Sequence, residues 1–182
     1  MESAEDRARA IFGERAAFYT TSTTHSDPRV LQRVVELARP QSHWNVLDIG
    51  TGTGHTAFSF APHVRSVTGI DLTGQMLAEA ERLRKNKALS NVTFEIGDAH
   101  LLPHGDKCFD LVTCRRAAHH FSNIRQALGE SLTRDVSKDD ERKIHSTLNN
   151  LTASQKAAFN LVEQNGELYL NHWYVLISAQ AR

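Results

Sequence analysis

The stretch Asp48-Ile49-Gly50-Thr51-Gly52-Thr53-Gly54 connects a short apolar run to a helical pattern and decides the fold class of this chain. The preceding residues, Asn45-Val46-Leu47, are typical of a buried strand, and residues 56–61 have a helical period. Glycines allow the backbone to turn tightly and to approach a ligand closely. The turn also points the free N–H groups at the start of the helix toward that ligand. A ligand site is therefore expected between this strand and this helix.

Strand-like and helix-like patterns alternate on both sides of the turn. The expected helices cover residues 3–19, 28–40, 56–61, 73–87 and 123–132, and the expected strands cover residues 45–49, 64–70, 92–96 and 109–114. Thr73 is expected as the N-cap of its helix, and the polar residues 20–28 are expected as a loop. This alternation predicts an α/β fold with a mostly parallel sheet and right-handed crossovers. Ligands on such sheets bind outside the carboxyl ends of the strands.

The composition bounds the class of partner. Lys plus Arg and Asp plus Glu both number 21 in the 182 residues, so the formal net charge is zero. This balance gives no electrostatic reason to expect nucleic acid or an anionic membrane as partner. No apolar run approaches the roughly 20 residues that span a bilayer, and neither a secretion signal nor a disulfide framework is evident. We expect one cytoplasmic domain with a small-molecule partner, in an oligomeric state that the sequence does not indicate.

Two classes of nucleotide-binding domain fit the glycine-rich turn. Gly52-x-Gly54-x-x-Ala57, with Asp71 further along, also satisfies the fingerprint of NAD(P)-dependent oxidoreductases. Asp48 separates the two classes, because a carboxylate two residues before the first glycine repels a pyrophosphate. S-adenosylmethionine instead presents an ammonium and a sulfonium, which are both cationic. The charge of Asp48 therefore favours S-adenosylmethionine, with the oxidoreductase as the alternative.

Two further acids end the next two predicted strands. Asp71 ends the second strand, where its carboxylate can accept hydrogen bonds from both hydroxyls of a ribose. Asp98 ends the third strand and can accept a hydrogen bond from an adenine amino group. Either acid alone is commonly a helix cap or a loop residue. Together with Asp48 they predict one pocket for one extended ligand.

Successive motifs along the chain resemble those of class I methyltransferases. They are Val46 to Gly54, Gly69-Ile70-Asp71, Gly97-Asp98-Ala99 and Phe109-Asp110-Leu111-Val112. Ala118-His119-His120-Phe121 resembles the group that includes ubiquinone and menaquinone biosynthesis C-methyltransferases. The resemblance implies a Rossmann-like, doubly wound fold and methyl transfer from S-adenosylmethionine. It covers roughly residues 10–130 and is much more specific than one glycine-rich turn.

The resemblance also implies which residues hold the cofactor. They are Asp48, which holds the turn, and Gly50, Thr51, Gly52, Gly54, Asp71, Leu72, Asp98, Ala99 and Arg115. It divides the single domain, residues 1–182, into N-terminal cap helices over 1–40, a cofactor-binding core over 44–130 and an atypical part over 131–182.

Few catalytic groups are expected, because methyl transfer from a sulfonium depends mainly on proximity and alignment. A base helps where the acceptor has to lose a proton. The candidates are Arg115 or Arg116, His119 and His120 after the fourth strand, and the segment from Tyr19 to His25, which folds over the cofactor in related enzymes. Within that segment Tyr19 is preferred. Adjacent histidines at such a junction are equally often polar caps. No set of His and Cys residues has the spacing of a metal site.

The family pattern is lost after Glu130. The resemblance predicts a glycine-containing turn and an apolar fifth strand there, but residues 131–143 are polar and charged. Residues 139–149 and 152–164 are expected as helices and residues 167–179 as a strand. We hypothesise that an internal segment with the fifth strand is absent and that residues 168–177 occupy the vacant sheet edge. A shortened, non-catalytic cofactor-binding relative is therefore a further alternative, and the acceptor atom stays open between carbon, oxygen and nitrogen.

Overall fold

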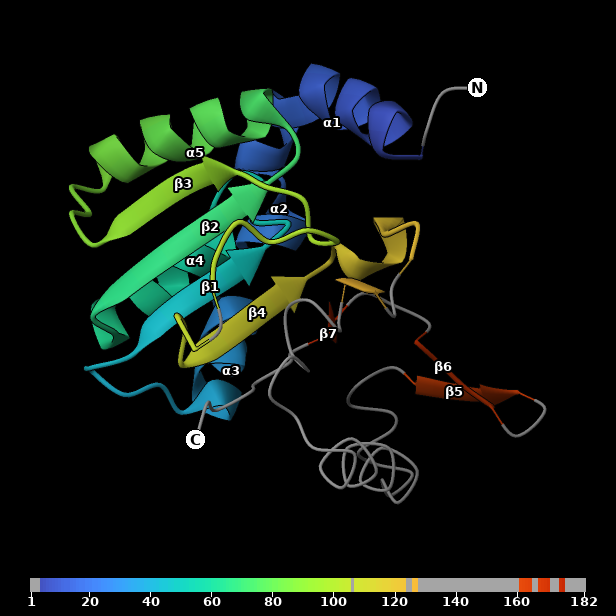
Figure 1. Cartoon of the computed structure of the whole chain (residues 1–182). Helices are drawn as coiled ribbons and strands as arrows, with labels where there is room; N and C mark the ends of the chain where they lie inside the picture. The colour runs from blue at the N-terminus through green and yellow to red at the C-terminus, as the bar shows by residue number, and fades with distance from the viewer. Residues whose placement is uncertain are drawn as a thin grey trace.

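Figure 1 shows the computed structural model, which describes residues 4–105, 107–123, 126–127, 161–164, 167–170 and 174–175. The expected helix over 139–149, most of the one over 152–164 and most of the one over 123–132 lie outside these residues. Within them the structure confirms the predicted α/β fold with a mostly parallel sheet.

Four parallel strands and one short antiparallel strand form the central sheet. They are β1 (Asn45–Ile49), β2 (Ser66–Asp71), β3 (Val92–Ile96), β4 (Leu111–Arg115) and β7 (Tyr174–Val175), in the order β3-β2-β1-β4-β7. The central strand β1 pairs with β2 on one side and with β4 on the other, so that Asp48 lies opposite both Gly69 and Thr113. The carboxyl ends of the four parallel strands therefore meet at one edge of the sheet (Figure 1).

The helices lie over the sheet and along this edge. They are α1 (Ala4–Thr21), α2 (Thr23–Ser26), α3 (Pro28–Ala38), α4 (His55–Phe60) and α5 (Gly74–Asn86), with the 3-10 turns η1 (Ala61–His63) and η2 (Ala118–His120). Val34, Phe58 and Phe60 of α3 and α4 pack with Val46 and Val67 of the sheet in one apolar cluster. No helix in the described part of the chain is long and apolar enough to cross a membrane.

The second face of the sheet carries a separate apolar cluster. Leu47 and Ile49 of β1 pack there with Ile70, Ala99 and Val112. Alternate residues of β1 thus reach opposite faces, as the two-residue period of a strand requires. A strand that is covered on both faces has a nearly continuous apolar sequence, which explains why β1 was recognisable from its residues.

In the N-terminal half one expectation was wrong, and another was confirmed in position but not in its hydrogen bond. The predicted loop over residues 20–28 contains α2, a single turn in which the backbone N–H groups of His25 and Ser26 bond to the Ser22 carbonyl. One turn is too short to leave a periodic apolar pattern. Thr73 lies at the N-cap of α5, but its side chain makes no capping hydrogen bond. Instead, its backbone N–H donates to Asp71 Oδ1 at 2.9 Å.

The C-terminal elements also differ from expectation. Leu161–Gln164, predicted as a helix end, forms strand β5, which pairs antiparallel with β6 (Glu167–Leu170). Gln164 lies opposite Glu167 in this pair of strands. The predicted strand over 167–179 is divided, since Tyr174–Val175 pairs with Cys114 and Arg115 of β4 instead. Of residues 168–177, the described part that occupies the sheet edge is β7.

Candidate functional site

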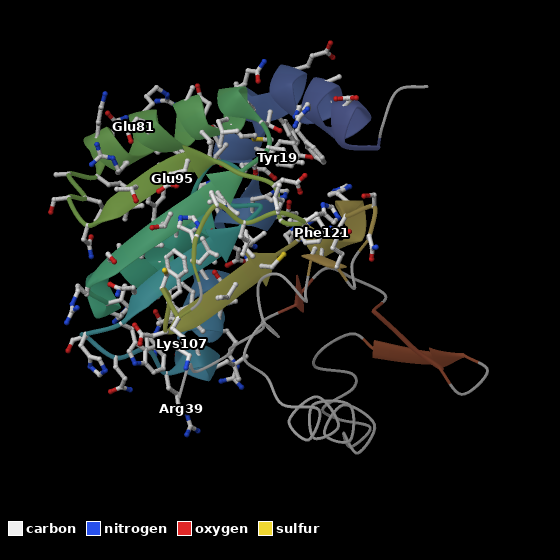
Figure 2. The ribbon with its side chains drawn as sticks, in the orientation of Figure 1. Tyr19, Arg39, Glu81, Glu95, Lys107 and Phe121 are labelled. Carbon is white, nitrogen blue, oxygen red and sulfur yellow. The ribbon has the colours of Figure 1, made fainter. Side chains whose placement is uncertain are left out.

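A cavity of about 650 Å³ lies at the carboxyl ends of β1, β2, β3 and β4. Five segments form its wall, and their lining residues are Ile11, Phe12, Arg15, Tyr19 and His25; Ile49 to Thr53, His55 and Thr56; Asp71 to Thr73 and Met76; Gly97 to His100; and Arg115 to Ala117, His120 and Phe121. Its size falls within the roughly 300–1,000 Å³ that is typical of small-molecule sites. Figure 2 shows Tyr19 and Phe121 on this side of the molecule, beyond the strand ends.

The glycine-rich turn needs its glycines for two different reasons. Gly50, Gly52 and Gly54 have positive φ angles of 63°, 56° and 87°, which side chains rarely adopt. A Cβ atom on Gly50 would lie 2.3 Å from Cβ of Ala117, and one on Gly54 would lie 2.8 Å from the Phe58 ring. Nothing lies within 4 Å of the corresponding position on Gly52. Packing therefore requires Gly50 and Gly54, whereas Gly52 leaves open space beside the cavity.

Asp48 lies beneath the turn and not in the cavity wall. Its side chain is buried, with Oδ2 accepting from Thr51 Oγ1 at 2.7 Å and Oδ1 accepting from Thr113 Oγ1 at 2.8 Å. Burial raises its pKa to about 6, against the hydrogen bonds from both threonines and the charge of Arg115. Asp48 thus ties the turn to β4. Its position does not support direct contact with a bound ligand, because the strand period directs this side chain below the turn. Gly54 is likewise absent from the lining residues.

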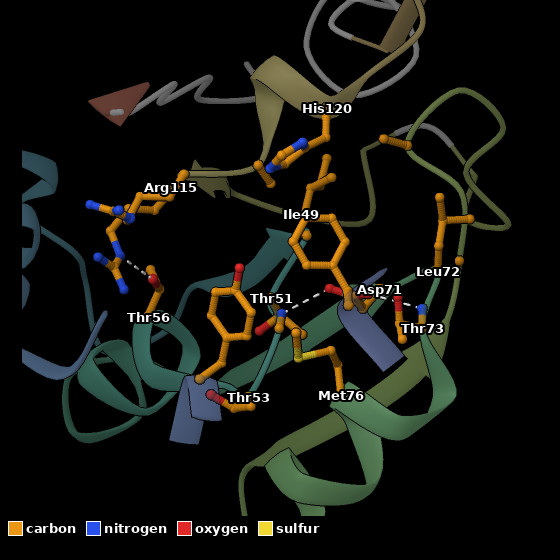
Figure 3. A pocket seen from close by; sticks show the side chains of 18 of the residues that line it. Ile49, Thr51, Thr53, Thr56, Asp71, Leu72, Thr73, Met76, Arg115 and His120 are labelled. Carbon is orange, nitrogen blue, oxygen red and sulfur yellow. Dashed lines mark hydrogen bonds between the residues drawn. The ribbon is translucent and has the colours of Figure 1, made fainter. Parts of the chain in front are cut away.

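Asp71 joins two elements that border the cavity (Figure 3). Its Oδ2 accepts a hydrogen bond from the backbone N–H of Gly52, and its Oδ1 accepts one from the N–H of Thr73, both at 2.9 Å. Burial raises the pKa of this carboxyl. The hydrogen bonds from the neighbouring residues oppose this rise. Asp71 lines the cavity, so its carboxylate lies where it can accept a hydrogen bond from a ligand.

Asp98 is held by His100, a residue whose role the sequence did not indicate. Asp98 Oδ1 accepts from the backbone N–H of His100 at 2.8 Å and lies 2.7 Å from Nδ1 of the same residue. The other ring nitrogen, Nε2, accepts from the N–H of Asn123 at 3.2 Å. Nδ1 therefore carries the hydrogen and donates a hydrogen bond to Oδ1 of Asp98. This leaves Oδ2 of Asp98 for an amino group of a ligand.

Aromatic rings from α1 and α2 cover the outer side of the cavity. Tyr19 lies with its ring centroid 4.7 Å from that of His25 and 5.8 Å from that of Phe12. Phe12 in turn lies 4.8 Å from His120, which follows β4. Two of the predicted catalytic residues, Tyr19 and His120, thus line the cavity, and the side chain of His119 lies outside the described set. Burial lowers the pKa of His120, which favours the neutral imidazole.

Arg115 connects this aromatic cover to the core. Its Nε donates to Thr56 Oγ1 at 2.7 Å (Figure 3). Its Nη2 donates to the backbone carbonyl of His25, also at 2.7 Å. Burial, followed by the positive charges of Arg116 and Arg115, lowers the pKa of His25 to about 4. Burial also lowers the pKa of His55, whose buried Nε2 has no hydrogen-bond partner among the described residues. Both imidazoles are therefore neutral near pH 7.

Several lining residues could not be recognised from the sequence. Phe12 and Arg15 belong to α1, which has little apolar periodicity, and their proximity to the site depends on how α1 packs. His55 is the first residue of α4, directly after the glycine-rich turn. The remaining predicted cofactor residues do line the cavity; these are Gly50, Thr51, Gly52, Asp71, Leu72, Asp98, Ala99 and Arg115. Among the residues that the structure describes, no three His, Cys, Asp or Glu side chains gather as a metal site.

A parallel sheet with a glycine-rich turn after β1 and acids after β2 and β3 defines a nucleotide-binding α/β domain. Within this class the chain belongs to the S-adenosylmethionine-dependent methyltransferases, since the family described as "Methyltransferase domain" matches residues 40–180. The cofactor that this family assignment supports is S-adenosylmethionine.

Known relatives agree with this assignment. The uncharacterized methyltransferase YcgJ of Bacillus subtilis is 39% identical over 119 residues, which cover 65% of this chain and 47% of YcgJ. The demethylmenaquinone methyltransferase of Thermotoga maritima is 39% identical over 107 residues, covering 57% of this chain and 44% of that protein. The chain thus spans less than half the length of these curated relatives.

Solved structures share the fold. The crystal structure of YcgJ matches with a TM-score of 0.55 and 24% identity, over 80% of this chain and 93% of that chain. A SAM dependent methyltransferase from Aquifex aeolicus matches with a TM-score of 0.52 and 22% identity, over 56% of this chain and 55% of that chain. The resemblance to class I methyltransferases is thereby confirmed at the level of the fold.

Proposed function

We propose that this chain transfers the methyl group of S-adenosylmethionine to a small-molecule acceptor that binds in the same cavity. The observation that carries the proposal is the meeting of four strand ends around one cavity, with a cover of aromatic rings from α1 and α2. The zero net charge supports a small acceptor over a nucleic acid.

The cofactor site follows from the two acids that line the cavity. The carboxylate of Asp71 accepts hydrogen bonds from the ribose hydroxyls, and Oδ2 of Asp98 accepts one from the adenine amino group. Leu72 and Ala99 line the wall between these acids and supply apolar contact for the base. Gly52 leaves open space where a ligand approaches the backbone.

When bound, the cofactor supplies an activated methyl group with a neutral thioether as leaving group. The residues of this chain then have to align the acceptor in line with the breaking carbon–sulfur bond and exclude water. Phe12 and Tyr19 exclude water by covering the cavity. Partial burial lowers the pKa of His120 and favours its neutral imidazole, which can accept the proton that an acceptor hydroxyl, amine or acidic carbon loses.

Calorimetric titration with S-adenosylhomocysteine, beside NADH, tests the cofactor half of the proposal. Binding of S-adenosylhomocysteine alone, weakened at least tenfold in Asp71→Ala, is the expected result, because this substitution removes both ribose acceptors. Glu36→Gln, on the exposed face of α3, is the matched control and is expected to bind normally. Binding of NADH, or of neither ligand, would contradict the proposal. Normal binding without turnover in an acceptor screen would instead favour a non-catalytic cofactor-binding role.

A further inference from the structure

His100 holds the acid that follows β3 in one orientation. Oδ1 of Asp98 accepts a hydrogen bond from the backbone N–H of His100 at 2.8 Å and another from its ring Nδ1 at 2.7 Å. The side chain of Asp98 is 38% exposed and lines the cavity. The χ2 torsion of an aspartate has broad minima, so a partly exposed carboxylate turns unless donors hold it. Both hydrogen bonds that the described residues donate to this carboxylate reach Oδ1, and Oδ2 is therefore the oxygen that faces a ligand.

The ring of His100 is itself fixed from its other side. Its Nε2 accepts from the backbone N–H of Asn123 at 3.2 Å, and the Ser122 hydroxyl lies 3.5 Å from the same nitrogen. The ring packs edge-on against Phe121, with the centroids 5.8 Å apart, and 11% of the side chain is exposed. A half-turn of the imidazole would put a carbon in the place of each nitrogen and lose both hydrogen bonds. The Asn123 N–H thus decides that Nδ1 faces Asp98 and carries the hydrogen.

His100 joins two parts of the cavity wall that come from different strand ends. Asp98 follows β3 and Phe121 follows β4, and both line the cavity. The backbone carbonyl of His100 also accepts from the side-chain amide of Gln126 at 3.2 Å. Side chains that bind a ligand are positioned by neighbours whose own rotamers are locked by packing and hydrogen bonds. His100 stands in this relationship to Asp98.

We propose that His100 positions Asp98 so that the site selects a 6-aminopurine. The 6-amino group of adenine donates a hydrogen bond to Oδ2, whereas the 6-oxo group of hypoxanthine places a second acceptor against the carboxylate. Without the ring donor, Asp98 turns, and this discrimination is lost while the other contacts of the cavity remain. The inference rests on the proposed function and goes beyond it, because it assigns base selection to a residue that acts through Asp98.

The test compares S-adenosylhomocysteine with its 6-oxo analogue S-inosylhomocysteine by calorimetric titration of the full chain. The wild-type chain is expected to bind S-adenosylhomocysteine about tenfold more tightly, because the analogue brings no donor to a charged acceptor. His100→Asn should keep most of this preference, since the amide of asparagine can donate from about the position of Nδ1. His100→Gln should reduce the preference to about threefold or less, since the longer amide replaces Nε2 at Asn123 and not Nδ1 at Asp98. His63→Gln, an exposed residue of η1 outside the cavity wall, is the matched control and keeps the full preference.

The ratio of the two affinities separates positioning from a purely structural role. If His100→Gln weakened both ligands equally and left the ratio unchanged, His100 would only hold the two loops together, and the inference would be wrong. The same ratio in His100→Asn and His100→Gln would also overturn it, because the donor at Nδ1 would then not decide the selection.

The imidazole of the wild-type chain provides a second measurement, which also serves if His100→Gln fails to fold. Nitrogen-15 NMR, with the His100 signals identified by their absence in His100→Asn, is expected to show the hydrogen on Nδ1 with and without S-adenosylhomocysteine. A hydrogen on Nε2 would overturn the inference. If the wild-type chain binds neither ligand, the proposed function fails as well, whereas S-adenosylhomocysteine binding without preference over S-inosylhomocysteine overturns the inference alone.

Discussion

The carboxylate of Asp71 accepts a hydrogen bond of 2.9 Å from the backbone N–H of Gly52, 19 residues earlier in the chain. The same carboxylate accepts from the N–H of Thr73 at the start of α5. One side chain at the end of β2 therefore fixes the glycine-rich turn relative to α5 before any ligand binds. A site whose polar groups are positioned in advance has less entropy to lose on binding.

Asp71→Asn is expected to weaken both folding and cofactor binding. The amide has one acceptor oxygen in place of two, so either Gly52 or Thr73 keeps a buried N–H without a partner. Such a group costs about 1–3 kcal/mol of stability, measurable by urea unfolding, and S-adenosylhomocysteine affinity should fall with it. Asp27→Asn is the matched control, because asparagine caps a helix such as α3 as well as aspartate does. If Asp71→Asn bound S-adenosylhomocysteine as tightly as the wild-type chain, Asp71 would not be a cofactor-binding residue.

Gly50→Ala and Gly52→Ala should separate folding from binding. At Gly50 the new Cβ meets Ala117 at 2.3 Å and the φ angle is positive, so we expect a loss of unfolding free energy beyond the backbone penalty. At Gly52 nothing lies within 4 Å, so the loss should stay near the roughly 1–2 kcal/mol of the left-handed conformation. Gly52→Ala should nevertheless weaken S-adenosylhomocysteine binding by calorimetry, because its methyl group enters open space beside the cavity. Equal stability losses in the two variants would contradict this distinction.

Asp48 should make stability depend on pH in the acid range. Its pKa in the folded chain is about 6, above the ordinary aspartate pKa of 3.8, so the folded state holds the proton more tightly than the unfolded state. This contribution is fully present below pH 4 and is lost as the pH rises to about 6. The unfolding free energy of the wild-type chain relative to Asp48→Asn should therefore fall by about 2–3 kcal/mol over this range. Urea titrations of both chains at pH 4, 5, 6 and 7 measure the difference, and a difference that rises with pH would contradict the assignment.

Arg115→Gln should loosen the cover of the cavity. It removes the hydrogen bonds to Thr56 Oγ1 and to the carbonyl of His25, which join β4 to α4 and α2. Hydrogen–deuterium exchange in residues 22–26 should become faster, while exchange in β1 and β2 stays unchanged. Thr56→Val removes one of the two bonds and should have a smaller effect. Arg82→Gln, whose surface pair with Glu79 lies on α5, is the control that should leave residues 22–26 as they are.

The glycine-rich turn and the acids at the strand ends could be predicted from the sequence, because both depend on residues that are neighbours in the chain. The turn from Gly50 to Gly54 required glycines because of its local backbone conformation, and Asp71 and Asp98 lie at strand ends that a parallel sheet brings to one edge. The position of Asp48 was not predictable from its charge. The charge of Asp48 favours a cationic ligand, but the strand period directs its side chain to Thr51 and Thr113 below the turn.

The sequence by itself determined the order of strands and helices through β4 and the identity of the acids at the strand ends, because both depend on local periodicity. Tertiary structure alone decided which side chains meet across the cavity. Arg115 reaches the carbonyl of His25, and Phe12 packs on His120, although these pairs are far apart in the chain. The pairing of Tyr174–Val175 with β4 is of the same kind. Such contacts depend on how α1, α2 and the sheet edge come together in space, and the spacing of residues along the chain does not encode that arrangement.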